Sequence, residues 1–114
     1  MSVTFTIQGI EPDYDNFKNF VDISNHNARD ILWALQLPGT DEPQPCGSVR
    51  GRELREACEK YLEHPNTKME APRETFVTGN YYQCGRRGGY VSSLTRELLA
   101  LAKQAGDLGV INYG

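Results

Sequence analysis

The sequence predicts an α+β fold, in which a small, mostly antiparallel sheet of three to four strands has three helices packed on one face. Two patterns support this prediction. Short stretches of β-forming apolar residues lie near both ends of the chain, and three longer stretches repeat apolar residues every three or four positions. A chain of 114 residues is long enough for one compact core, so residues 1–114 are expected to form a single domain.

The opening residues predict the first strand. Val3, Phe5 and Ile7 alternate with polar residues, which is the pattern of a strand with one buried face, and Gly9 follows where the strand should end. A second apolar run, Phe20–Ile23, comes after a loop that is too short for a crossover helix. The two strands are therefore expected to pair in antiparallel fashion.

Three amphipathic helices are predicted next. Ser24 or Asn25 is expected to cap the first, because a short side chain with an oxygen accepts hydrogen bonds from the N–H groups at a helix start. The helices are expected to end at Pro38, before Pro65 and at Gly106. Their apolar stripes are Ala28, Ile31, Leu32 and Leu35; Leu54, Ala57, Cys58, Tyr61 and Leu62; and Val91, Leu94, Leu98, Leu101, Ala102 and Ala105.

Connectors and further strands complete the predicted fold. Leu37–Pro45 and His64–Pro72 contain or are bounded by prolines, so both are expected to be connectors. Thr75–Tyr82 is rich in β-forming residues and predicts a strand, and Val110–Tyr113 can close the sheet.

Charge and composition exclude several classes of protein. The net charge is −3 and the isoelectric point is near 5.3, whereas duplex-binding domains usually have one above about 9, so general nucleic-acid binding is not expected. No apolar run reaches the roughly 18 residues that span a membrane, and residues 1–10 lack the continuous apolar run of a signal peptide, so neither segment is expected. The three cysteines have no C-x-x-C spacing and are expected to be free thiols, which favours a cytoplasmic location.

The most unusual stretch of the sequence is 79–90, directly before the third predicted helix. Arg86 and Arg87 carry bidentate donors, Gly88 and Gly89 can expose backbone N–H groups, and a helix start adds positive potential. Together these features suit a phosphate or a carboxylate. The alternative is a surface turn whose arginines are only solvated.

Aromatic residues extend this candidate binding surface. Tyr81, Tyr82 and Tyr90 lie near the arginines in sequence, a mixture that is typical of recognition surfaces but also of a strand face at a sheet edge. Trp33 points about 200° away from the apolar stripe of its helix, so it is either covered by another element or exposed as an interface anchor.

Polar residues gather at the start of the first helix. Asn25 and Asn27 either cap this helix or hold a polar ligand or the backbone of a partner. Both interpretations stay open at the level of sequence.

No complete set of catalytic residues is found, so no catalytic residue, metal site or cofactor is predicted. Cys84 lies near two arginines, which favour a thiolate, but the histidines His26 and His64 lie in other elements and cannot be assigned as its base. The cysteine and histidine spacings match no zinc module, and the acidic loop Glu11–Asp15 lacks the later ligands of a calcium site. An enzyme that uses Cys84 or an acid of this loop is the remaining catalytic alternative.

Three motifs carry a resemblance to other proteins: Ser-Asn-x-Asn-Ala at 24–28, Gly-Gly-Tyr-Val at 88–91 and Val-x-x-Tyr-Gly at 110–114. In these motifs the chain resembles a group of small uncharacterised proteins from bacterial and phage genomes. The group has no known activity, and the resemblance implies an accessory or regulatory protein.

The leading hypothesis is a non-enzymatic cytoplasmic binding or regulatory protein, encoded by a phage or another mobile element, that acts by contact with a protein partner. The alternative is a domain that binds a phosphorylated small ligand or a nucleotide through Arg86, Arg87 and the backbone amides of 88–91. A homodimer is also open, because a small domain can bury an exposed Trp33 or an edge strand in a two-fold interface. No membrane partner is expected.

Overall fold

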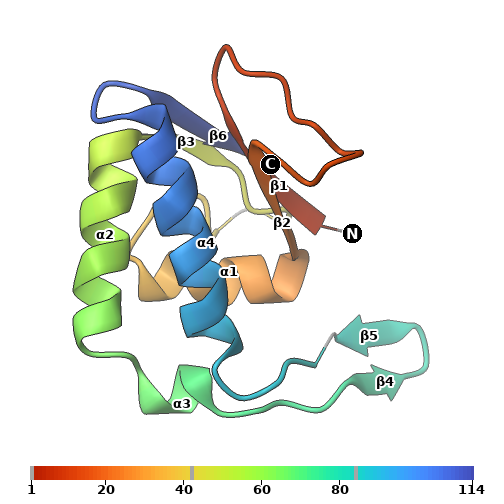
Figure 1. Cartoon of the computed structure of the whole chain (residues 1–114). Helices are drawn as coiled ribbons and strands as arrows, with labels where there is room; N and C mark the ends of the chain where they lie inside the picture. Colours follow the sequence, from red (N-terminus) through yellow and green to blue (C-terminus); the bar gives the residue numbers. More distant parts are fainter. Residues whose placement is uncertain (1, 42, 84) are drawn as a thin grey trace.

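The computed structural model describes residues 2–41, 43–83 and 85–114, and its described part holds a four-stranded sheet, four helices and a separate hairpin (Figure 1). The α+β prediction is confirmed. The sheet contains β1 (Ser2–Ile7), β2 (Phe20–Ser24), β3 (Gly47–Arg50) and β6 (Val110–Tyr113), and the hairpin contains β4 (Phe76–Thr78) and β5 (Tyr81–Gln83). The helices are α1 (Asn25–Ala34), α2 (Gly51–Glu63), α3 (Thr67–Glu70) and α4 (Tyr90–Ala105).

The four strands of the sheet lie in the order β2-β1-β6-β3, and all neighbours are antiparallel. Phe5 of β1 pairs with Val21 of β2 on one side and with Tyr113 of β6 on the other. The predicted pairing of the first two strands is therefore confirmed. Residues 110–113 form a strand of the sheet as predicted, but this strand lies between β1 and β3 and does not close an edge.

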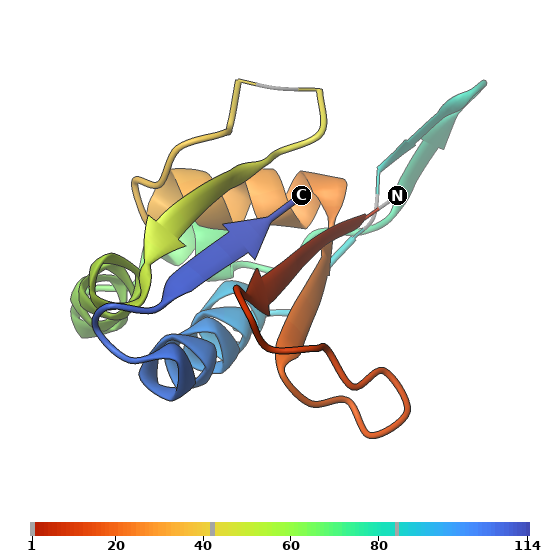
Figure 2. The ribbon, with the colours of Figure 1, turned by 90° about the horizontal axis from the view of Figure 1, so that it is seen from above.

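One face of the sheet carries the core. Val3, Phe5 and Ile7 are buried, as the alternating pattern predicted, and the buried apolar residues of the helices form one cluster with them. The opposite face is polar: Thr4 Oγ1 donates to Asp22 Oδ1 at 2.8 Å across this face. The helices therefore cover a single face, as predicted, and α2 and α4 lie side by side (Figures 1 and 2).

Two short elements were not predicted. β3 has four residues, of which only Val49 is buried, so its apolar pattern is too weak to identify a strand. The predicted connector His64–Pro72 contains the one-turn helix α3, because Asn66 Oδ1 accepts hydrogen bonds from the N–H groups of Lys68 and Met69.

The segment predicted as one strand at 75–82 is instead a hairpin outside the main sheet. Its two strands are joined by the turn Gly79-Asn80, and Gly79 has a φ of 57°, which the first position of such a two-residue turn requires. Figure 2 shows the hairpin extending away from the rest of the molecule. We call residues 73–86 the arm.

No helix in the described ranges is long and apolar enough to cross a membrane.

Candidate functional site

The base of the arm is closed by two arginines. The backbone N–H of Arg73 donates to the carbonyl oxygen of Arg86 at 2.8 Å, and the reverse hydrogen bond measures 2.7 Å. The side chain of Arg86 is only 6% exposed, and that of Arg73 is partly buried. Both guanidinium groups point back towards the first turns of α1.

On α1, Asp30 and Asn27 accept hydrogen bonds from both arginines. Asp30 Oδ2 lies 2.6 Å from Arg86 Nη1 and 3.1 Å from Arg73 Nη1. Asn27 Oδ1 accepts from Arg73 Nη2 at 2.9 Å and from Arg86 Nη1 at 3.2 Å. We call Asn27, Asp30, Arg73 and Arg86 the clamp, because these four side chains fasten the arm to α1.

The sequence of α1 explains how the clamp forms locally. Asn27 and Asp30 are three residues apart, so they lie on the same side of the helix. Asn27 Nδ2 donates to Ser24 Oγ at 3.0 Å, which directs the amide oxygen of Asn27 towards the arginines. Ser24 occupies the N-cap position as predicted, but its side chain makes no capping bond to the helix backbone.

The start of α4 is occupied by a carboxylate of the same chain. Glu70 Oε1 accepts from the backbone N–H of Ser92 at 3.0 Å, and Glu70 Oε2 accepts from the hydroxyl of Tyr61. Burial, together with the hydrogen bond to Glu70, raises the pKa of Tyr61 to about 12, so this hydroxyl stays protonated at neutral pH. The helix start that the sequence marked as an anion site thus holds an internal anion.

The predicted pair of ligand-binding arginines is consequently not assembled. Arg86 is committed to Asp30 inside the protein, while Arg87 is exposed and lies 5.9 Å from the ring centroid of Tyr90, within cation–π range. Gly88 and Gly89 are exposed, and the N–H of Gly89 donates to the carbonyl oxygen of Glu70 at 2.8 Å. The phosphate-binding alternative therefore loses its main cation and part of its backbone donors.

Three other residues of the predicted surface are placed as follows. Tyr81 and Tyr82 belong to β5, and their side chains lie outside the described part of the structure, as does Cys84. Asn25 begins α1, and its Oδ1 has no hydrogen-bond partner among the described residues.

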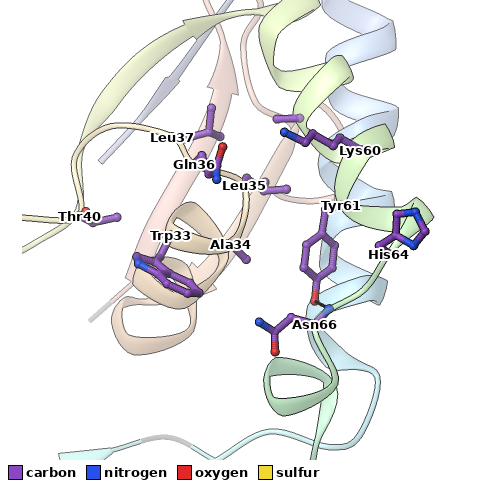
Figure 3. A pocket seen from close by; sticks show the side chains of 11 residues that line it. Trp33, Ala34, Leu35, Gln36, Leu37, Thr40, Lys60, Tyr61, His64 and Asn66 are labelled. Atoms are coloured by element: carbon purple, nitrogen blue, oxygen red, sulfur yellow. Dashed lines mark hydrogen bonds between the residues drawn. The ribbon is translucent and has the colours of Figure 1, made fainter.

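Trp33 is exposed, with 64% of its surface accessible, and stands at the edge of a pocket of about 530 Å³. Figure 3 shows the rings of Trp33 and Tyr61 on opposite sides of this pocket, with Lys60 above them and Asn66 below. The pocket lies between the C-terminal end of α1 and the second half of α2. Its other lining residues are Ala34, Leu35, Gln36, Leu37, Thr40, Ala57 and His64.

The turn after α1 shapes one wall of the pocket. Gln36 has a φ of 57°, and its N–H donates to the carbonyl oxygen of Trp33 at 3.0 Å, while the N–H of Leu37 donates to Leu32 at 2.9 Å. This pair of bonds is the Schellman motif, whose left-handed residue is usually glycine. A glutamine in this conformation is strained, and strained residues are found preferentially at binding sites.

The sequence predicted neither the pocket nor an exposed apolar patch elsewhere on the surface. The patch is on the loop between β1 and β2, where Ile10, Tyr14 and Phe17 are exposed and Phe17 has a φ of 54°. An aromatic residue in this conformation is uncommon, and the angle is visible only in the folded backbone, so the sequence carried no signal for this patch.

Comparisons of the chain with models of known protein families, with curated proteins and with solved structures found no match.

Proposed function

We propose that this protein is a non-enzymatic binding protein that contacts a protein partner through the arm. The observation that carries the proposal is an exposed apolar strand, β4, in an arm that the buried Arg86 and the partly buried Arg73 fasten to α1. The rest of the molecule then acts as the scaffold of this strand.

The exposed strand is unusual for a protein surface. Residues 74–80 are all exposed, and Val77 has 62% of its surface accessible. Phe76 and Val77 are neighbours in a strand, so they point to opposite faces and make both faces of the hairpin apolar. In the described part of the chain no third strand pairs with either edge of this hairpin. Such open edges are templates for pairing with a strand of another chain.

The clamp gives the arm its orientation. An isolated two-stranded hairpin is only marginally stable in water. Moving a guanidinium out of water costs on the order of several kcal/mol. Pairing with a carboxylate offsets this cost, as Asp30 does for Arg86. A surface turn with no role would not need this anchorage, whereas a binding element benefits from it because less freedom is lost on association.

Several further points support a binding rather than a catalytic role. The described residues contain no group of three side chains suited to hold a metal ion. Burial raises the pKa of the Cys58 thiol to about 12, which keeps it unreactive at neutral pH. A free and exposed Cys46 suits a reducing compartment, so the cytoplasm is the proposed location. The regulatory role and the origin in a mobile element rest on the sequence resemblance.

The experiment is photocrosslinking from defined positions of the full chain, in the cells from which the protein comes. A photoreactive phenylalanine analogue is placed at Val77, and matched variants carry it at Leu108 and Phe17, which are even more exposed but lie outside the arm. We expect one adduct of defined mass from position 77 that is absent from position 108. The yield of this adduct should fall when Asp30→Asn loosens the clamp.

The other outcomes are equally informative. Equal labelling from positions 77 and 108 would refute the proposal, and an adduct from position 17 alone would move the contact to the loop between β1 and β2. An adduct with twice the mass of the chain would identify a second copy as the partner, in place of a different protein.

A further inference from the structure

We propose that the pocket between α1 and α2 binds a small organic carboxylate with an apolar body, such as an aryl or branched alkyl acid. This site is separate from the arm, and the proposal does not depend on the function proposed above.

The walls of the pocket suit an apolar body. Leu35 and Tyr61 are buried, and Leu37 and Ala57 are partly buried against the core, so their outer surfaces form a fixed apolar floor. The exposed indole of Trp33 stands opposite Tyr61 (Figure 3). A flat ligand between these rings would cover an aromatic surface that now faces water. A volume of about 530 Å³ lies within the range of pockets for small ligands.

The lining of the pocket carries the positive charge of Lys60. Its lining includes Lys60 and His64 but no aspartate or glutamate, although the whole chain has a net charge of −3. Lys60 reaches along the upper side of the pocket (Figure 3) and makes no ion pair with any described residue. The acid one turn before it, Glu56, is bonded to Arg52 at 3.1 Å.

The lower side of the pocket offers a hydrogen-bond donor. Asn66 Oδ1 is engaged by the N–H groups of Lys68 and Met69, so the free hydrogen-bonding capacity of this amide is in its NH₂ group. Figure 3 places the Asn66 side chain below the space between the two rings. The hydroxyl of Tyr61 donates to Glu70 and is therefore not free to donate to a ligand.

These observations select the ligand chemistry. An ammonium group and an amide NH₂ group are donors, and a carboxylate is the acceptor that satisfies them. A cationic ligand would find no acid in the lining, and a highly polar ligand such as a sugar would leave the apolar floor uncovered. A carboxylate on an aromatic or branched aliphatic body matches both parts of the site.

The strained Gln36 provides a second, independent sign of a binding role. Glycine would relieve the backbone at this position, yet a glutamine side chain lines the pocket there. Retaining a strained residue makes physical sense when its side chain contacts a ligand.

The test uses the full chain and three probes of one shape: phenylacetate, the neutral phenylacetamide and the cationic phenethylamine. Trp33 is the only tryptophan of the chain, so its fluorescence reports on the pocket directly. Probes of this size typically bind with a Kd of about 1 mM. We expect phenylacetate to bind several times more tightly than phenylacetamide, and phenethylamine to bind least.

Two variants assign the contacts. Lys60→Gln should raise the Kd for phenylacetate about fivefold, while Lys103→Gln, which removes an exposed lysine of α4 that does not line the pocket, should leave it unchanged. Trp33→Ala, followed by calorimetry because the fluorophore is lost, should weaken all three probes. Both positions are exposed, so neither variant threatens folding.

Three results would overturn the proposal: no saturable binding of phenylacetate, equal Kd values for phenylacetate and phenylacetamide, or an unchanged Kd in Lys60→Gln. Val77→Ser in the arm should leave all Kd values unchanged. Failure at the pocket and failure at the arm are therefore distinguishable.

Discussion

The exchange Asp30→Asn removes one negative charge from the clamp and leaves the shape of the side chain almost unchanged. In the native structure this carboxylate accepts hydrogen bonds from Arg86 at 2.6 Å and from Arg73 at 3.1 Å. After the exchange, the buried Arg86 loses its ionic partner and keeps only amide oxygens as acceptors. We therefore expect a large decrease in the free energy of unfolding and faster local opening at the base of the arm.

The magnitude follows from burial. Leaving one ion of a buried pair without its partner typically costs about 3–5 kcal/mol. The Asp30 side chain is 32% exposed, so water can replace part of the lost interaction, and we expect a lower cost of about 2–3 kcal/mol. Domains of this size are typically stable by about 5–15 kcal/mol, so the variant should still fold.

The measurement is urea unfolding at pH 7, combined with hydrogen exchange of the backbone amides of Arg73 and Arg86. The matched control is Glu56→Gln, which breaks the Arg52–Glu56 pair, where the side chains are 66% and 57% exposed. This exposed pair on one helix should contribute no more than about 0.5 kcal/mol. Amide exchange at the base of the arm should accelerate in Asp30→Asn and not in the control.

A double-mutant cycle separates the ion pair from other effects of the exchange. If Arg86→Met is already present, adding Asp30→Asn should cost much less than it does alone, because its main partner is gone. A cost of Asp30→Asn below about 1 kcal/mol, or additive costs in the cycle, would refute the argument from burial.

The remaining predictions concern single positions. Gln36→Gly should raise the free energy of unfolding by about 0.5–1 kcal/mol in urea titrations, because glycine adopts φ 57° without strain, whereas Gln36→Ala should not. Gly85→Ala should speed amide exchange in the arm, because its new Cβ would lie 2.4 Å from the carbonyl oxygen of Arg73, while Gly88→Ala meets only ordinary contacts and should behave as wild type. Burial raises the pKa of Cys58 from its ordinary value of 9.0 to about 12. The unfolded chain therefore loses this proton first, and stability should fall above pH 9 by up to about 1.4 kcal/mol per pH unit. Cys58→Ala should give a shallower decline in unfolding free energy between pH 9 and pH 12, and identical slopes would contradict the assigned shift.

Local patterns were sufficient for the elements that bury a regular stripe. The alternating residues of β1 and the helical stripes of α1, α2 and α4 are buried or packed against the core, because period two and period 3.6 each bring one face together. β3 was not predicted, because a four-residue strand with one buried residue shows no alternation of apolar and polar residues. Val49 becomes part of the sheet only through its pairing with Ile111, far along the chain.

The candidate site also combines features that the local sequence predicts with contacts that form only on folding. The sequence predicted an anion site at Arg86, Arg87 and a helix start, and in the structure Arg86 and this helix start each contact a carboxylate of the same chain. It could not identify the anions as Asp30 and Glu70, because Arg86 and Asp30 are 56 positions apart and meet only after folding. Trp33 was likewise known to point away from its apolar stripe, but its exposure depends on whether another element covers it.

By itself, the sequence determined the fold class, the main helices, the first strand pair and the residue types that carry charge and aromatic surface, because these depend on periodicity and composition within short segments. The tertiary structure alone decided which charges neutralise each other, that 75–82 forms part of an exposed arm outside the main sheet, and that Trp33 and Tyr61 face each other across a pocket. These are contacts between distant segments, and their energies depend on burial that exists only once the chain has folded.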